Sequence, residues 1–147
     1  MIVDAAPDVS QEFLDLALIA QDAALNAPDD AVQYMVQMVP IHLQYDPTHD
    51  QRVAGGCLNC TYLGLWTDQD PRPSQHGHIW IFEHGITAVS KDVLGQIYQT
   101  IIHEMGHALQ RDHVLDGMHA RGLEPAYSPL VQHVYGWAAQ SLPRPRG

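Results

Sequence analysis

Apolar and polar positions change their spacing several times along the chain, and each change predicts a structural element. From residue 9 to residue 26, apolar side chains recur every three or four positions, which predicts a helix with Ser10 as its N-cap. A shorter helix is expected over residues 30–38, and Pro40 ends it because proline cannot continue a helix. The N-terminal part of the chain is therefore expected to be helical.

After Pro40, apolar and polar residues alternate with a period of two, which predicts short strands. Ile41, Leu43 and Tyr45 alternate with polar residues, as in a half-buried strand. After a loop, two further strands are expected, and the second of them is rich in aromatic and β-branched side chains. The loop and these two strands cover residues 46–56, 57–66 and 78–83. The turn before the last strand is marked by Pro71, Pro73 and Gly77.

Helical spacing returns near residue 90. Ser90, with Asp92 in the first turn, is expected to open a long helix. Gly95 lies inside this helix and should weaken it by about 1 kcal/mol relative to alanine. Its apolar face consists of Val93, Leu94, Ile97, Ile101 and Met105.

The end of the chain adds one more helix. Ser128 and Pro129 begin a helix over residues 129–141, and residues 142–147 form a frayed, disordered tail. The whole order of elements predicts an α+β fold, with a small mixed sheet, an N-terminal helix, a long helix near the middle and a C-terminal helix. One domain is expected to span residues 1–147.

Composition narrows the class of protein. The chain has 147 residues, 46% of them apolar, as in ordinary globular domains. Its net charge of −10, with Lys91 as the single lysine, argues against a nucleic-acid partner, because little would attract a phosphate backbone. No apolar run is long enough for a membrane span, and no secretory signal is visible. A cytoplasmic protein and a fragment of a longer precursor would both have this sequence, and the oligomeric state stays open.

The two cysteines, Cys57 and Cys60, form a single Cys-x-x-Cys pair. One such pair cannot complete a four-ligand zinc site, and no βαβ pattern follows it to suggest a thioredoxin. A short-loop disulfide or two reduced thiols are the simplest interpretations, and a zinc knuckle completed by a nearby histidine is the alternative.

The clearest chemical signal is the sequence His-Glu-Met-Gly-His at residues 103–107. On a helix, His103 and His107 project about 40° apart from one face, so both imidazoles can bind one ion. Glu104 can then reach a water on that ion without being a ligand, and His113 offers a third nitrogen. Three such ligands and an open fourth position describe a catalytic Zn²⁺ site.

This stretch resembles the metzincin zinc peptidases, whose motif is His-Glu-x-x-His-x-x-Gly-x-x-His followed by a Met-turn. The resemblance covers residues 90–120 and implies a single metzincin-like (zincin-like) catalytic domain that acts as a zinc-dependent endopeptidase on a polypeptide substrate. It implies the zinc ligands His103, His107 and His113, the general base Glu104 and the Met-turn residue Met118.

Two features depart from the family pattern. Gln110 stands where the family has glycine, although the helix must break between residues 108 and 112. On a continuous helix, His113 would lie about 9 Å along the axis from His107 and about 120° around it. Met118 comes soon after His113 and lacks the usual Ser-x-Met pattern. His113 is the preferred third ligand, and the alternatives are Asp116, His119 and Glu124, of which Glu124 would indicate a gluzincin-like arrangement.

The resemblance also implies a mechanism. Zinc lowers the pKa of its water toward about 7, and Glu104 takes the proton as this water attacks a scissile carbonyl. The strand at 78–83 is a candidate edge strand for an extended peptide. Tyr127 or Tyr135 could donate a hydrogen bond to the oxyanion, although packing is the simpler role for each. His76 and His78 are interpreted as histidines that decorate this strand.

Two other functions fit parts of the pattern. The YbeY-like metal-dependent endoribonucleases have a similar three-histidine spacing, but they carry glycine where this chain has Glu104, and this chain is acidic. A non-catalytic zinc-binding module is the other alternative, and Gln110 is the feature that favours it.

Overall fold

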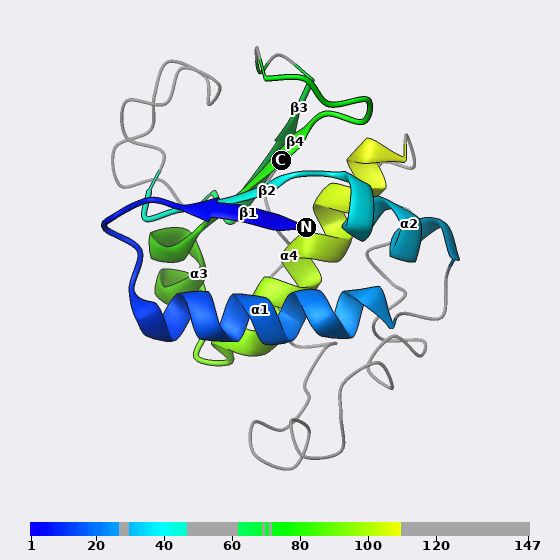
Figure 1. Ribbon diagram of the computed structural model, residues 1–147. Helices are drawn as coiled ribbons and strands as arrows, with labels where there is room; N and C mark the ends of the chain where they lie inside the picture. The colour runs from blue at the N-terminus through cyan, green and yellow to red at the C-terminus, as the bar shows by residue number, and fades with distance from the viewer. Residues whose placement is uncertain (27–29, 47–61, 69, 71, 110–147) are drawn as a thin grey trace.

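The computed structural model describes residues 1–26, 30–46, 62–68, 70 and 72–109. In this part of the chain four helices and four strands form a mixed α+β fold, which confirms the predicted class (Figure 1). The elements, in chain order, are β1 (Ile2–Ala5), α1 (Gln11–Leu25), α2 (Asp30–Met38), β2 (Ile41–Gln44), β3 (Gly64–Thr67), β4 (His78–Phe82), α3 (Glu83–Val89) and α4 (Val93–Ala108). None of these helices is long and apolar enough to cross a membrane.

The strands form one sheet in the order β1-β2-β4-β3. β1, β2 and β4 are parallel, whereas β3 pairs with β4 in the antiparallel sense. Alternate side chains of a strand point to opposite faces. One face joins the main apolar core with α1 and α4 through Ile41, Leu43, Ile79 and Ile81. The other face carries His42, His78, Trp80 and Phe82.

Two predictions about the strands are wrong, and both errors concern neighbours in the sheet. The strand at 41–45 was expected to be half-buried, but Ile41, His42 and Leu43 are all buried because β2 lies between β1 and β4. The strand at 78–83 was expected at an edge, but β4 is an interior strand, and all five of its residues are buried. In the described part of the chain the outer strands are β1 and β3.

The first two helices agree with their predicted ranges. The Ser10 hydroxyl accepts a hydrogen bond from the Phe13 amide at 3.1 Å and so caps α1 as expected. The buried face of α1 contains mostly small side chains, among them Ala17, Ala20 and Ala24. Small side chains let two helices approach closely, and α1 packs mainly on α4. The N-terminal helix thus supports the helix that carries the His-Glu-x-x-His sequence (Figure 1).

A short helix, α3, was not predicted. It begins directly after β4, and its first residue, Glu83, accepts hydrogen bonds from the Ser10 amide at 2.8 Å and the Ser10 hydroxyl at 2.7 Å. Ser90 ends α3, and Asp92 rather than Ser90 is the N-cap of α4. Seven residues are too few to show a clear helical period, which is why the sequence pattern missed this element.

Gly95 is required by the cap of α4. The Asp92 carboxylate accepts a hydrogen bond from the Gly95 amide at 3.0 Å, and a Cβ on Gly95 would lie 2.4 Å from Asp92 Oδ2. We expect Gly95→Ala to leave the free energy of unfolding nearly unchanged, because a gain of about 1 kcal/mol in helix propensity is offset by a cap loss of similar size. With Asp92→Ala already present, Gly95→Ala should stabilise the protein by about 1 kcal/mol. Urea unfolding of the four proteins of this cycle measures the difference, and equal effects in both backgrounds would contradict the explanation.

Several predictions lie outside the described residues. They concern the first part of the strand at 57–66, the cysteines Cys57 and Cys60, the C-terminal helix at 129–141 and the tail at 142–147. They stay predictions.

Candidate metal centre

The His-Glu-x-x-His sequence lies on α4, the most enclosed helix of the described fold. α4 contacts the other three helices as well as β3 and β4, and every residue from Leu94 to Gly106 is buried. Its apolar side chains, including Ile97, Ile101 and Met105, join the main core. The sequence pattern predicted this apolar face correctly.

The opposite side of α4 is a polar stripe, which is buried except at its last member. Spacings of three and four residues place its members along one face of the helix. The stripe consists of Gln96, Gln99, Thr100, His103, Glu104 and His107. Only the last three were named from the sequence. The same helical spacing, extended toward the N-terminus of α4, could also have identified the other three polar residues. Buried polar groups nearly always have hydrogen-bond partners. This side of α4 is therefore the one on which polar interactions, rather than apolar packing, are concentrated.

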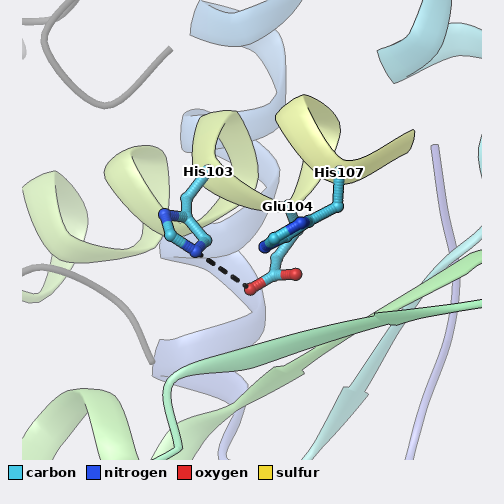
Figure 2. Close-up of side chains that lie close together, drawn as sticks. All are labelled: His103, Glu104 and His107. Atoms are coloured by element: carbon cyan, nitrogen blue, oxygen red, sulfur yellow. Dashed lines mark ion pairs between the residues drawn. The ribbon is translucent and has the colours of Figure 1, made fainter. Parts of the chain in front are cut away.

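His103, Glu104 and His107 form a compact donor group. One ligand atom from each of them lies within 4.8 Å of the ligand atoms of the other two. The two imidazoles meet edge to face, with ring centroids 5.1 Å apart. Figure 2 shows the three side chains projecting from the same side of α4, with the Glu104 carboxylate close to both rings. Two imidazole nitrogens and a carboxylate so close together can hold a metal ion.

Burial divides this group into an inner and an outer part. His103 and Glu104 are almost completely buried, whereas His107 is partly exposed. His103 Nε2 lies 4.0 Å from Glu104 Oε1, which is an electrostatic contact and too long for a hydrogen bond (Figure 2). His107 is therefore the member of the group that lies nearest to solvent.

The helix ends where the prediction required it to end. Ala108 is the last residue of α4, and the Leu109 amide still donates to the Met105 carbonyl at 2.9 Å. This end agrees with the expected break between residues 108 and 112. His113 and its alternatives as third ligand lie outside the described residues, as do Gln110, Met118, Tyr127 and Tyr135.

β3 passes directly beside this site. A Cβ on Gly64 would lie 2.7 Å from Thr100 Cγ2, 3.0 Å from the Trp80 carbonyl oxygen and 3.2 Å from Glu104 Cγ. Any side chain here would therefore push β3 away from α4. The absence of a side chain at residue 64 lets the antiparallel strand β3 approach the Glu104 side chain closely.

Gly64→Ala is expected to destabilise the protein by about 1–3 kcal/mol, as overpacking of a core usually does. The added methyl group meets backbone as well as side chain, so the neighbours cannot simply rotate away. Adding Thr100→Ser removes the closest obstacle, the Cγ2 methyl, and keeps the hydroxyl that donates to the Gln96 carbonyl. The double variant should recover part of the loss in urea unfolding. A stabilising effect of Gly64→Ala alone would contradict the close approach of β3 and α4.

His78 does more than decorate its strand. His78 is 3% exposed. Its two ring nitrogens lie within hydrogen-bond distance of His42 Nε2 and of the Arg72 carbonyl oxygen. It is buried because β4 is an interior strand. His76 lies outside the strand and contacts the ring of Tyr34 edge to face. Neither residue belongs to the donor group on α4.

Comparisons with family models, curated proteins and solved structures found no match to this chain. The site is therefore interpreted from its own residues and geometry.

Proposed function

We propose that this protein is a zinc-dependent endopeptidase of the metzincin type. The observation that carries the proposal is the approach of ligand atoms of His103, Glu104 and His107 to within 4.8 Å of one another on one face of α4, where the first two are buried. Packing alone does not require two imidazoles and a carboxylate at this place in a core. A helix that presents them together suits hydrolysis assisted by a metal ion.

The donor set fits the proposed metal. Imidazole nitrogens suit zinc and the neighbouring transition metals, whereas magnesium and calcium prefer sites made of oxygen ligands. His103 and His107 would hold the ion, and the third ligand would come from beyond residue 109, with His113 as the preferred residue. Zinc at such a site supplies a Lewis acid that polarises a peptide carbonyl and makes water more acidic.

Glu104 would act as the general base. Its carboxylate lies beside both histidines and is completely buried, so it can accept a proton from water close to the ligands. It would then pass this proton to the nitrogen of the leaving amine, and the peptide C–N bond breaks. Burial strengthens this role because few bulk water molecules compete for the carboxylate.

The strand beside the site suggests how a polypeptide would bind. The sequence pointed to residues 78–83 as the edge strand, but β4 is interior, and among the described strands β3 is the outer one on the side of α4. An extended peptide paired with β3 would bring main-chain carbonyls close to Glu104. Binding through the main chain gives affinity for many sequences, as an endopeptidase needs.

Digestion of casein and of RNA, run side by side with the full chain, tests the proposal. Casein cleavage that a chelator abolishes and added zinc restores would support the peptidase. Cleavage of RNA alone would favour the endoribonuclease and overturn the proposal. If neither substrate is cut while one zinc ion stays bound per chain, the protein is a binding module.

A further inference from the structure

A chain of hydrogen-bond contacts crosses the face of the sheet opposite α1 and α4. His42 Nδ1 lies 2.9 Å from Asp4 Oδ1, and His42 Nε2 lies 2.9 Å from His78 Nδ1. His78 Nε2 in turn lies 2.9 Å from the main-chain oxygen of Arg72. The contacts join β1, β2 and β4 to the segment that precedes β4. Both imidazoles are only 3% exposed.

The hydrogens in this series of contacts can be counted by starting from Asp4 at one end and from the Arg72 carbonyl at the other. A carboxylate and a carbonyl only accept hydrogen bonds, so His42 Nδ1 and His78 Nε2 must both carry hydrogen. The contact between the rings needs a third hydrogen, because two bare nitrogens 2.9 Å apart would repel each other. Two neutral imidazoles carry only two such hydrogens. The three hydrogen bonds therefore require one extra proton, which the two rings share.

The surrounding charges accommodate this proton. The Arg72 guanidinium donates to both oxygens of Asp70, and these hydrogen bonds lower the pKa of Asp70, so this carboxylate stays ionised. Arg72 also lies 3.5 Å from Asp4 Oδ2. Two carboxylates then face one guanidinium and one protonated histidine pair, so the charges balance. The Trp80 ring stacks on His42 with a centroid distance of 4.5 Å and adds no charge.

We propose that the His42–His78 pair is a pH-dependent latch, which holds the segment at Arg72 onto the sheet when it carries the shared proton and releases it when the proton is lost. After the loss, two hydrogens remain for three contacts. The hydrogen bond to Asp4 is charge-assisted and therefore strong, and the contact between the rings is buried. The bond to the Arg72 carbonyl is the one that breaks, because it is neutral and only partly buried, so water can replace the imidazole as its donor.

The direction of the pH dependence follows from the surroundings of His42. Burial lowers the pKa of His42, the hydrogen bond and charge of Asp4 raise it, and the charges of Arg72 and His78 lower it. The net effect places the pKa below the ordinary histidine value of about 6.5. The latch is therefore closed in mildly acidic solution and opens as the pH rises toward neutrality.

The imidazole ¹⁵N signals of the full chain, followed from about pH 8 to about pH 4.5, test the proposal by counting protons. We expect His42 and His78 to take up one proton between them with one common midpoint. A second proton would set two N–H groups against each other at the 2.9 Å contact. The ¹³C signal of the Arg72 carbonyl should move with the same midpoint. Two protons taken up independently, or none, would overturn the latch.

Asp4→Asn is the informative variant. The Asn amide can donate to His42 Nδ1, so three hydrogen bonds then need only two neutral imidazoles. We expect the common midpoint to fall by about one to three pH units, because a nearby negative charge is lost, and the Arg72 carbonyl signal to become insensitive to pH near neutrality. Asp8→Asn, at an exposed position next to β1, is the control and should behave like wild type. An unchanged midpoint in Asp4→Asn would overturn the latch, and the wild-type titration decides the question if this variant does not fold.

Discussion

Glu104→Gln is expected to slow peptide hydrolysis by about 10²–10⁴-fold while one zinc ion stays bound per chain. Glutamine keeps the size of the buried side chain but cannot accept the proton from water. The two imidazoles keep their positions on α4, so the metal should remain. Steady-state kinetics with a protein substrate and metal analysis of the same sample measure both parts of the prediction.

Glu12→Gln is the matched control for this variant, since Glu12 is an exposed glutamate on α1. It should have the activity of wild type. Full activity in Glu104→Gln would remove Glu104 from the mechanism. Loss of zinc together with activity would show that the carboxylate acts mainly as a ligand.

His107→Ala is expected to weaken zinc binding by at least about a hundredfold. Replacing even a residue that only orients a metal ligand commonly costs 10–100-fold in affinity, and His107 is a candidate for direct contact. His107 is partly exposed, so its removal should change the free energy of unfolding much less than removal of the buried His103. Competition with a chromophoric zinc chelator measures the affinity, and urea unfolding measures the stability.

His84→Ala provides the comparison for this second variant. His84 lies on α3 and contacts the ring of Tyr45, away from the polar stripe of α4. Its removal should leave zinc affinity unchanged. If His84→Ala and His107→Ala have the same affinity as wild type, the donor group on α4 does not hold the ion.

Local signals in the sequence predicted local structure well. The Ser10 cap, the helical period that follows it and the stop before Pro40 gave both N-terminal helices nearly to the residue. The spacing of His103 and His107 likewise placed both imidazoles and Glu104 together, because a helix alone fixes their relation.

The errors concern features that depend on the sheet. Whether residues 78–83 form an edge or an interior strand depends on both of their neighbours. β3 comes directly before them in the chain, but β2 pairs with them from a distant part of the sequence. The role of His78 depends on His42, which is adjacent only because β2 and β4 are parallel neighbours. The sequence predicted that Gly95 weakens its helix. It could not show that the Asp92 side chain caps the helix at the Gly95 amide, because this contact depends on backbone geometry and not on the spacing of apolar residues.

The order of the strands also bears on how this protein folds. β1 pairs with β2, and β2 with β4, across separations of roughly forty residues in each case. Contacts so distant along the chain form slowly, because a long loop must close before any pairing is gained, whereas α1 and α4 can become helical within microseconds. In refolding experiments, circular dichroism should therefore recover its helical signal well before the proposed site regains any affinity for zinc.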